Sequence, residues 1–254
     1  CALCRSGNAQ VCAKQWQPGF NGQGSFAEYV AIPQADFNAV HIPDQMTFDT
    51  AAGLGCRFAT AYRGLIQVAQ VSHGETVAVF GCGGVGLAAI MIAKSRGARV
   101  VAVDKSNSAL DRATLAGADM RLDAQYDEVV KEIKKFGNNG VDITVDALGS
   151  IETSRLAVES LRRLGRHVQI GLLPPAVIQD QATIPMHLVI GRELQILGSH
   201  GMSAATYPDM LDDIITGRLR PDLLVERVIS LEEAPAALMA MNNGSTPGVT
   251  IIRP

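Results

Sequence analysis

From residue 76 to residue 199 the chain alternates short apolar runs with amphipathic stretches of about 10 to 15 residues. The strands that these runs predict are apolar on both faces, which is typical of strands covered by helices on both sides. The pattern therefore predicts an α/β fold with a doubly wound parallel sheet. The expected strands are 76–81, 99–104, 120–123, 141–148, 166–172 and 194–199, and the expected helices are 84–97, 108–118, 126–136 and 151–164.

The segments before and after this region differ from it in composition. Residues 1–50 are rich in Gly, Pro, Gln and Asn, with short apolar pieces such as FAEYVAIP at 26–33, which predicts loops with a few short strands. After a Pro-containing connection that leads into the strand at 194–199, a further series of elements is expected. These are a helix at 207–216, an extended segment at 223–230, a helix at 231–241 and a strand at 248–253.

The stretch VAVFGCGGVGLAAI joins the first predicted strand to the first predicted helix. In its spacing Gly81-x-Gly83-x-x-Gly86, the first glycine permits a tight turn, the second admits a pyrophosphate, and the third lets helix and strand pack closely. The helix start, with Gly84 and Val85, directs N–H groups and a positive dipole end at the phosphates. The stretch therefore predicts a Rossmann-type dinucleotide site. A purely structural turn and a methyltransferase that binds S-adenosylmethionine are the alternatives.

An acidic residue ends the second predicted strand. Asp104 lies eighteen residues after Gly86, where a carboxylate can accept hydrogen bonds from both ribose hydroxyls of an adenosine. A 2′-phosphate would meet the negative charge of this carboxylate, so NAD is favoured over NADP. Lys105 follows directly and is a further candidate cofactor-binding residue.

Three of the five cysteines lie within the first twelve residues, as Cys1, Cys4 and Cys12. Closely spaced thiolates suit Zn²⁺, which accepts tetrahedral sulfur ligation and stabilises small loops that have little core of their own. Three sulfurs leave one position of the tetrahedron open. Cys82 lies between two glycines of the phosphate turn and is interpreted as a spacer.

Together these features resemble the zinc-containing medium-chain dehydrogenases, the alcohol dehydrogenase family. In that family a structural-zinc lobe carries four cysteines, and Cys1, Cys4 and Cys12 match the second, third and fourth. We therefore expect the chain to lack an N-terminal segment that carries the first cysteine. The resemblance extends along all 254 residues through the stretches GSFAEYV, GCRFATAYRGL, GCGGVG, VDALGS, VQIGL and ILGSHG.

The resemblance also implies a domain organisation. Residues 1–57 are expected to end a mainly β (GroES-like) catalytic domain and to carry the zinc lobe. Residues 58–199 are expected to form the NAD-binding domain, and residues 200–254 to return to the catalytic domain.

Further site residues are implied by the resemblance. Cys56 matches the third protein ligand of the catalytic zinc, although a lone cysteine is more often a small buried hydrophobic residue. Thr60 is expected to pack near the nicotinamide ring. The strand ends are expected to line the adenine and nicotinamide pockets through Ala147, Leu148, Ile170, Gly171 and Leu172.

The implied reaction is hydride transfer between an alcohol and nicotinamide, with zinc as the Lewis acid. The family's other catalytic-zinc ligands lie upstream, and none of the five histidines stands where one is expected. We therefore expect a zinc-dependent, NAD-linked alcohol dehydrogenase as the parent protein, and a chain that by itself oxidises no alcohol. A polyol dehydrogenase, a zinc-free quinone-reductase type and a non-catalytic dinucleotide-binding module are the alternatives.

Composition limits the partners. A chain with 47% hydrophobic and 19% charged residues and a net charge of −3 is typical of a soluble globular protein, not of one that binds nucleic acid or membranes. The expected partner is a small alcohol, aldehyde or ketone. The cysteine usage favours a reducing cytoplasm. The apolar strand at 194–199 needs a cover if it is a sheet edge, so we expect a homodimer or homotetramer.

Overall fold

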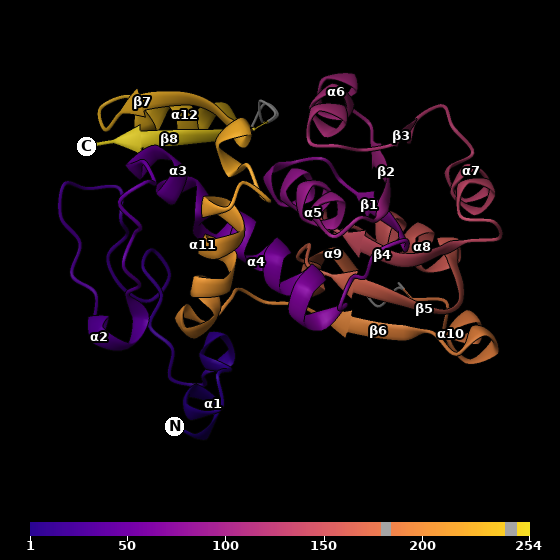
Figure 1. Ribbon diagram of the computed structural model, residues 1–254, viewed down its shortest axis with the longest axis horizontal. Helices are drawn as coiled ribbons and strands as arrows, with labels where there is room; N and C mark the ends of the chain where they lie inside the picture. Colours follow the sequence, from indigo (N-terminus) through magenta and orange to yellow (C-terminus); the bar gives the residue numbers. More distant parts are fainter. Residues whose placement is uncertain (179–183, 242–247) are drawn as a thin grey trace. The chain divides into compact units, whose positions relative to one another are not determined.

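The structure, a computed structural model, describes residues 1–178, 184–241 and 248–254. The chain forms two compact units, one made of Cys1–Ala59 with His200–Pro254 and the other of Thr60–Ser199 (Figure 1). The observed divisions therefore fall after residues 59 and 199, and the predicted ones after residues 57 and 199. Part of the Pro-containing connection before the strand at 194–199 lies outside the described residues.

The unit Thr60–Ser199 is built on a six-stranded sheet with the strand order β3-β2-β1-β4-β5-β6, in which every neighbouring pair is parallel. This order places the chain's crossover between β3 and β4, so the sheet grows outward in both directions from β1 and β4. The predicted doubly wound, Rossmann-type sheet is confirmed. The strands are β1 (Thr76–Phe80), β2 (Arg99–Asp104), β3 (Met120–Asp123), β4 (Val141–Asp146), β5 (Leu161–Gln169) and β6 (Gln195–Gly198).

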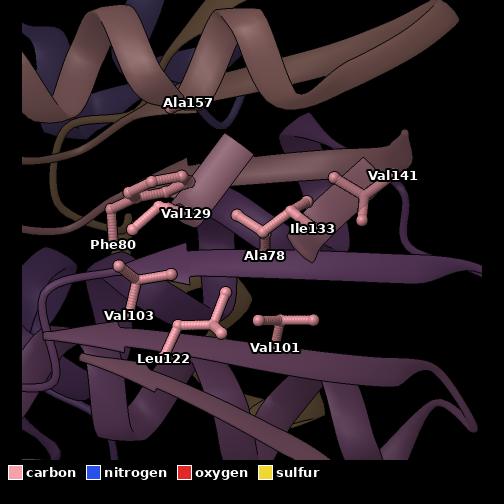
Figure 2. Packing of buried hydrophobic residues seen from close by; sticks show 9 residues of the cluster. All are labelled: Ala78, Phe80, Val101, Val103, Leu122, Val129, Ile133, Val141 and Ala157. Carbon is pink, nitrogen blue, oxygen red and sulfur yellow. The ribbon is translucent and has the colours of Figure 1, made fainter. Parts of the chain in front are cut away.

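Helices cover both faces of this sheet, as the apolar strands require. Every residue of β1 is buried, and its successive side chains point to opposite faces. On one face Phe80 packs in a cluster with Val129 and Ile133 of one helix (Figure 2). On the other face, a Cβ at Gly86 of another helix would contact the Val79 side chain. The helices of this unit after β1 are α5 (Gly84–Ser95), α6 (Asn107–Leu115), α7 (Val129–Phe136), α8 (Ile151–Ser160), α9 (Pro175–Ile178) and α10 (Met186–Arg192).

Several predicted boundaries are wrong. The helix expected at 151–164 ends at Ser160, because Leu161 already pairs with Val141 as the first residue of β5. The strand expected at 141–148 ends at Asp146, and the helix expected from 126 begins at Val129. The apolar pattern continues past Asp146, whose carboxylate accepts the N–H groups of Leu148 and Gly149 in the following loop.

A helical run that the sequence pattern did not predict links the two units. It comprises α3 (Phe48–Gly53), the wider turns η2 (Leu54–Phe58), α4 (Ala59–Tyr62) and the wider turns η3 (Arg63–Val68). Thr47 caps its start, because its side-chain oxygen accepts the Thr50 N–H. The Gly and Ala content of this segment carries little periodic signal, so the sequence pattern indicates no helix here.

The unit that holds both chain ends has a two-stranded parallel sheet, β7 (Val225–Ser230) with β8 (Val249–Arg253). The short strand expected at 26–33 is not formed, and no strand lies in the first fifty residues. The mainly β, GroES-like character of this part stays a prediction. The other elements are α1 (Ala2–Arg5), η1 (Ala9–Val11), α2 (Ala35–Asn38), η4 (Ala204–Thr206), α11 (Tyr207–Ile215), η5 (Pro221–Leu224) and α12 (Ala234–Ala240).

Within the described ranges, no helix combines the length and the apolar character needed to cross a bilayer.

Candidate cofactor and metal sites

The candidate cofactor residues lie at the carboxyl ends of neighbouring strands in the unit Thr60–Ser199. The glycine turn follows β1, Asp104 ends β2, Ala147 and Leu148 follow β4, and residues 170–172 follow β5. The ends of parallel strands meet at one edge of a sheet, and the crevice at a topological switch point is where such sheets bind ligands. The structure therefore brings these predicted residues to one edge.

A different structural feature explains glycine at each of the three positions of the turn. Gly81 adopts a φ of 89°, in the left-handed region, and a Cβ there would come within 3.1 Å of the Leu148 side chain. A Cβ at Gly86 would collide with the Gly81 carbonyl oxygen, so only glycine lets α5 approach the strand end. A Cβ at Gly83 would meet nothing within 4 Å. Gly83 is exposed and leaves open space beside the backbone.

Helix α5 begins at this open space. Gly84 is its first residue, and Gly83 in the N-cap position supplies no side-chain acceptor for the first N–H groups. Gly84 and Val85 are half-buried. A helix of this length presents about half a positive charge and unsatisfied N–H donors at its start. The turn therefore offers an anion site, which suits the pyrophosphate of a dinucleotide.

Asp104 stabilises the turn after β1 and is also a candidate contact for the cofactor. Its Oδ2 accepts the Cys82 N–H at 2.7 Å, and its Oδ1 accepts the Ser106 N–H at 2.8 Å. A carboxylate has about four acceptor positions, so about half of them remain for ribose hydroxyls. The same side chain therefore fixes the turn after β1 and keeps acceptor capacity at the sheet edge.

Two neighbouring side chains differ in their access to solvent. Lys105 is exposed and its Nζ lies 3.4 Å from the Glu152 carboxylate, a surface pair that contributes little to stability. Cys82 is fully buried, and burial together with the nearby Asp104 charge raises the pKa of its thiol. Cys82 therefore stays protonated and packs in the turn, in agreement with its interpretation as a spacer.

The loops after β4 and β5 present exposed apolar side chains. Leu148 is 59% exposed and Leu172 is 80% exposed, although β4 ends in the fully buried Asp146 and β5 ends in the half-buried Gln169. Ala147, Ile170 and Gly171 are half-buried. Exposed leucines next to an anion site are suited to cover the flat rings of a dinucleotide, so this placement is compatible with the predicted adenine and nicotinamide pockets.

Sequence reasoning missed one residue at this edge, Asp146. It ends β4 and is fully buried, and its carboxylate accepts hydrogen bonds from both following loop and helix residues. Its signal was present, since an acidic residue closes the apolar strand 141–146 as Asp104 closes β2.

Thr60 and Cys56 lie on either side of the division between the units. Thr60 is the first residue of its unit and is 5% exposed, within α4. Cys56 belongs to the other unit and is exposed, which contradicts the alternative that it is a buried hydrophobic residue. Among the described residues no group of three possible metal ligands includes Cys56. The catalytic-zinc role of Cys56 stays a prediction.

The three N-terminal cysteines do come together. The Cys1 Sγ lies 3.4 Å from the Cys4 Sγ and 3.7 Å from the Cys12 Sγ, and all three sulfurs lie within 4.8 Å of one another. The backbone N–H of Lys14 donates to the Cys12 Sγ at 3.4 Å and, as the largest effect, lowers the pKa of that thiol. Such a hydrogen bond favours the thiolate, which is the form that binds metal.

The sulfur spacing fits zinc. Tetrahedral bonds of about 2.3 Å place two sulfurs about 3.8 Å apart, close to the two distances found here. In the part of the chain that the structure describes, the group has three members and no fourth His, Cys, Asp or Glu. The three cysteines could therefore hold a zinc ion at three corners of a tetrahedron, and their role as a structural zinc site stays a prediction.

Comparison with known proteins identifies the family. Residues 84–216 match the family model of the zinc-binding dehydrogenases. The chain belongs to this family. The resemblance to zinc-containing medium-chain dehydrogenases is thereby confirmed.

Relatives of this chain are similar to it over most of its length. An alcohol dehydrogenase of Geobacillus stearothermophilus is 36% identical over 200 residues, which cover 78% of this chain and 56% of that protein. An NAD-dependent alcohol dehydrogenase of Sulfolobus acidocaldarius is 30% identical over 255 residues, covering 100% of this chain and 71% of the relative.

A solved structure shows the same fold. An alcohol dehydrogenase from Thermus sp. ATN1 superposes with a TM-score of 0.88 at 28% identity, covering 100% of this chain and 74% of that one. The chain thus spans between about half and three quarters of the length of these proteins.

Proposed function

We propose that the chain is the cofactor-binding part, with adjoining catalytic segments, of a zinc-dependent and NAD-linked alcohol dehydrogenase. The observation that carries this proposal is the glycine turn at the switch point of the sheet, with Asp104 at the neighbouring strand end, in a member of the zinc-binding dehydrogenases. The substrate class is a small alcohol, or the corresponding aldehyde or ketone.

Each residue of the site has a proposed task. The N–H groups at the start of α5 bind the pyrophosphate, which approaches over Gly83. Asp104 accepts the ribose hydroxyls, with Lys105 beside it. The loops at 147–148 and 170–172 enclose the rings, and Thr60 packs near the nicotinamide. Bound NAD supplies the hydride acceptor.

Two metal roles have to be separated. Cys1, Cys4 and Cys12 fit a structural zinc, which would order the N-terminal loop. Cys56 alone does not make a catalytic zinc site, because one ligand does not retain the ion. We therefore propose that the 254 residues bind NAD and that Cys56 needs further ligands before it can hold a catalytic zinc.

The cysteine cluster also bears on the alternatives. Sulfurs arranged at zinc-ligand distances favour a zinc-containing enzyme over the zinc-free quinone-reductase type. A polyol dehydrogenase would share the same cofactor edge and stays an alternative for the substrate.

Titration with reduced cofactors tests the proposal. The wild-type chain is expected to bind NADH more tightly than NADPH, measured by the fluorescence of the bound nicotinamide. A hydrogen bond to a charged group contributes about 1.5–3 kcal/mol, so Asp104→Ala is expected to weaken NADH by roughly ten- to a hundredfold. NADPH should be affected much less, because its phosphate no longer meets the carboxylate.

Asp104→Asn is the matched control for the turn itself. Asparagine keeps one oxygen that can accept the Cys82 N–H, so it separates loss of the ribose contact from distortion of the glycine turn. A wild-type chain that prefers NADPH would show that the assignment of Asp104 is wrong.

A further inference from the structure

Asp146 is a fully buried carboxylate at the end of β4 that the proposed function has not used. Five donors surround it. Its Oδ1 accepts the N–H groups of Leu148 at 3.0 Å and Gly149 at 2.8 Å. Its Oδ2 accepts the hydroxyls of Thr153 at 3.0 Å and Ser154 at 2.8 Å and the Nε2 of Gln169 at 3.1 Å.

The same residue also binds the loop after β5. Its backbone carbonyl accepts the N–H groups of Ile170 at 3.0 Å and Gly171 at 2.8 Å. The Gln169 Nε2, which donates to the Asp146 carboxylate, donates its second hydrogen to the Gly171 carbonyl at 2.9 Å. Asp146 therefore holds the starts of both loops, directly and through Gln169.

The two loops touch through their backbones, so their relative position has little tolerance. Gly149 has a φ of 85°, and a Cβ there would collide with the Leu172 carbonyl oxygen. A Cβ at Gly171 would collide with the Gly149 nitrogen. No side chain fits between these loops, and hydrogen bonds to Asp146 fix their spacing.

Two further buried side chains, His167 and Thr144, hold Gln169 in place through hydrogen bonds. Because the Gln169 amide nitrogen serves Asp146 and Gly171, its Oε1 is the acceptor facing the His167 Nε2 at 3.1 Å. The His167 Nδ1 then accepts the Thr144 hydroxyl at 3.0 Å. Burial lowers the pKa of His167, so the ring is neutral and this single arrangement of hydrogens persists at neutral pH.

The donors that contact the Asp146 carboxylate among the described residues are all neutral: two backbone N–H groups, two hydroxyls and one amide. A buried carboxylate is costly unless donors satisfy its oxygens, so this arrangement depends on the five donors converging on Asp146. A neutral residue in place of Asp146 would hold these five donors less strongly.

We propose that Asp146 is a positioning residue for the nicotinamide half of the cofactor. It sets the loops 147–149 and 170–172 in one fixed arrangement, whereas Asp104 and the glycine turn hold the adenosine half and the pyrophosphate. This inference rests on the proposed function and narrows it, because it assumes that these two loops receive the nicotinamide and that Asp104 and the glycine turn hold the adenosine half.

Asp146→Asn tests the inference in the full chain. The new Nδ2 of asparagine faces the Gln169 Nε2, and two donors cannot bond, so the link from Gln169 to the loop 170–172 weakens. The test compares affinities for NADH and for ADP-ribose, which lacks the nicotinamide, by titration calorimetry. NADH is expected to bind about tenfold more weakly, and ADP-ribose to be unchanged within about twofold.

Asp142→Asn is the matched control. Asp142 lies on the same strand and also accepts several donors, the Thr76 N–H and hydroxyl at 2.7 Å and the Arg162 Nε at 2.5 Å, but none belongs to the two loops. It should lower stability without changing the ratio of the two affinities. Gln169→Met is the second variant if Asp146→Asn does not fold, and it should shift the ratio in the same direction.

The outcomes separate the two proposals. Equal weakening of both ligands, or no weakening of either, would refute the positioning role of Asp146. A wild-type chain that binds neither NADH nor ADP-ribose would instead refute the proposed function.

Discussion

At the scale of single residues, Gly83 and Gly86 lie three positions apart in one turn and are glycines for different reasons. Alanine raises helix propensity by about 1 kcal/mol over glycine, but at Gly86 its Cβ collides with a backbone carbonyl and costs about 1–3 kcal/mol or more. Gly86→Ala is therefore expected to lower the melting temperature. Gly83→Ala meets no protein atom and should unfold like the wild type, yet bind NADH at least about tenfold more weakly, because its methyl group obstructs the pyrophosphate. Thermal unfolding and NADH titration of the two variants check this prediction. Equal melting temperatures and equal NADH affinities for Gly83→Ala and Gly86→Ala would contradict it.

At the scale of elements, the N-terminal loop has little structure of its own to stabilise it. Its helices α1 and η1 have four and three residues, far below the length that is stable alone, and Gln10 is their single buried residue. We expect elemental analysis to find one zinc per chain. The Cys4→Ser variant is expected to lose this zinc, and its N-terminal loop should become more sensitive to proteolysis. Cys56→Ser is the control and should keep the metal. Full zinc content in Cys4→Ser, or loss in Cys56→Ser, would show that the cluster is not the site.

At the scale of the whole molecule, β3 and β6 are the two edges of the six-stranded sheet, and the open side of β6 carries backbone groups with no neighbouring strand in the described chain. Such an edge is a template for pairing with another strand. We expect the chain to be a dimer or a dimer of dimers, with twice or four times the chain mass in light scattering at micromolar concentration. Its mass should fall towards that of one chain only on strong dilution. A monomer throughout the concentration series would count against this assembly.

The sequence by itself determined the features that depend on near neighbours. The order β1-α5-β2, the reason for glycine at position 86 and the place of Asp104 at a strand end all follow from spacing within about thirty residues. The cysteine cluster is equally local, because Cys1, Cys4 and Cys12 are joined by two short helical turns.

Only the tertiary structure decided the features that depend on distant partners. Residues 161–164 have a helical pattern, but pairing with β4 makes them the start of β5, with Leu164 at a φ of 61°. Residues 26–33 have a strand pattern and form no strand, since a strand needs a neighbour for its backbone hydrogen bonds. The role of Asp146 follows from Gln169, which is 23 residues away in sequence and 3.1 Å away in space. A local pattern states what a segment can form, and the partners brought to it by the fold decide what it does form.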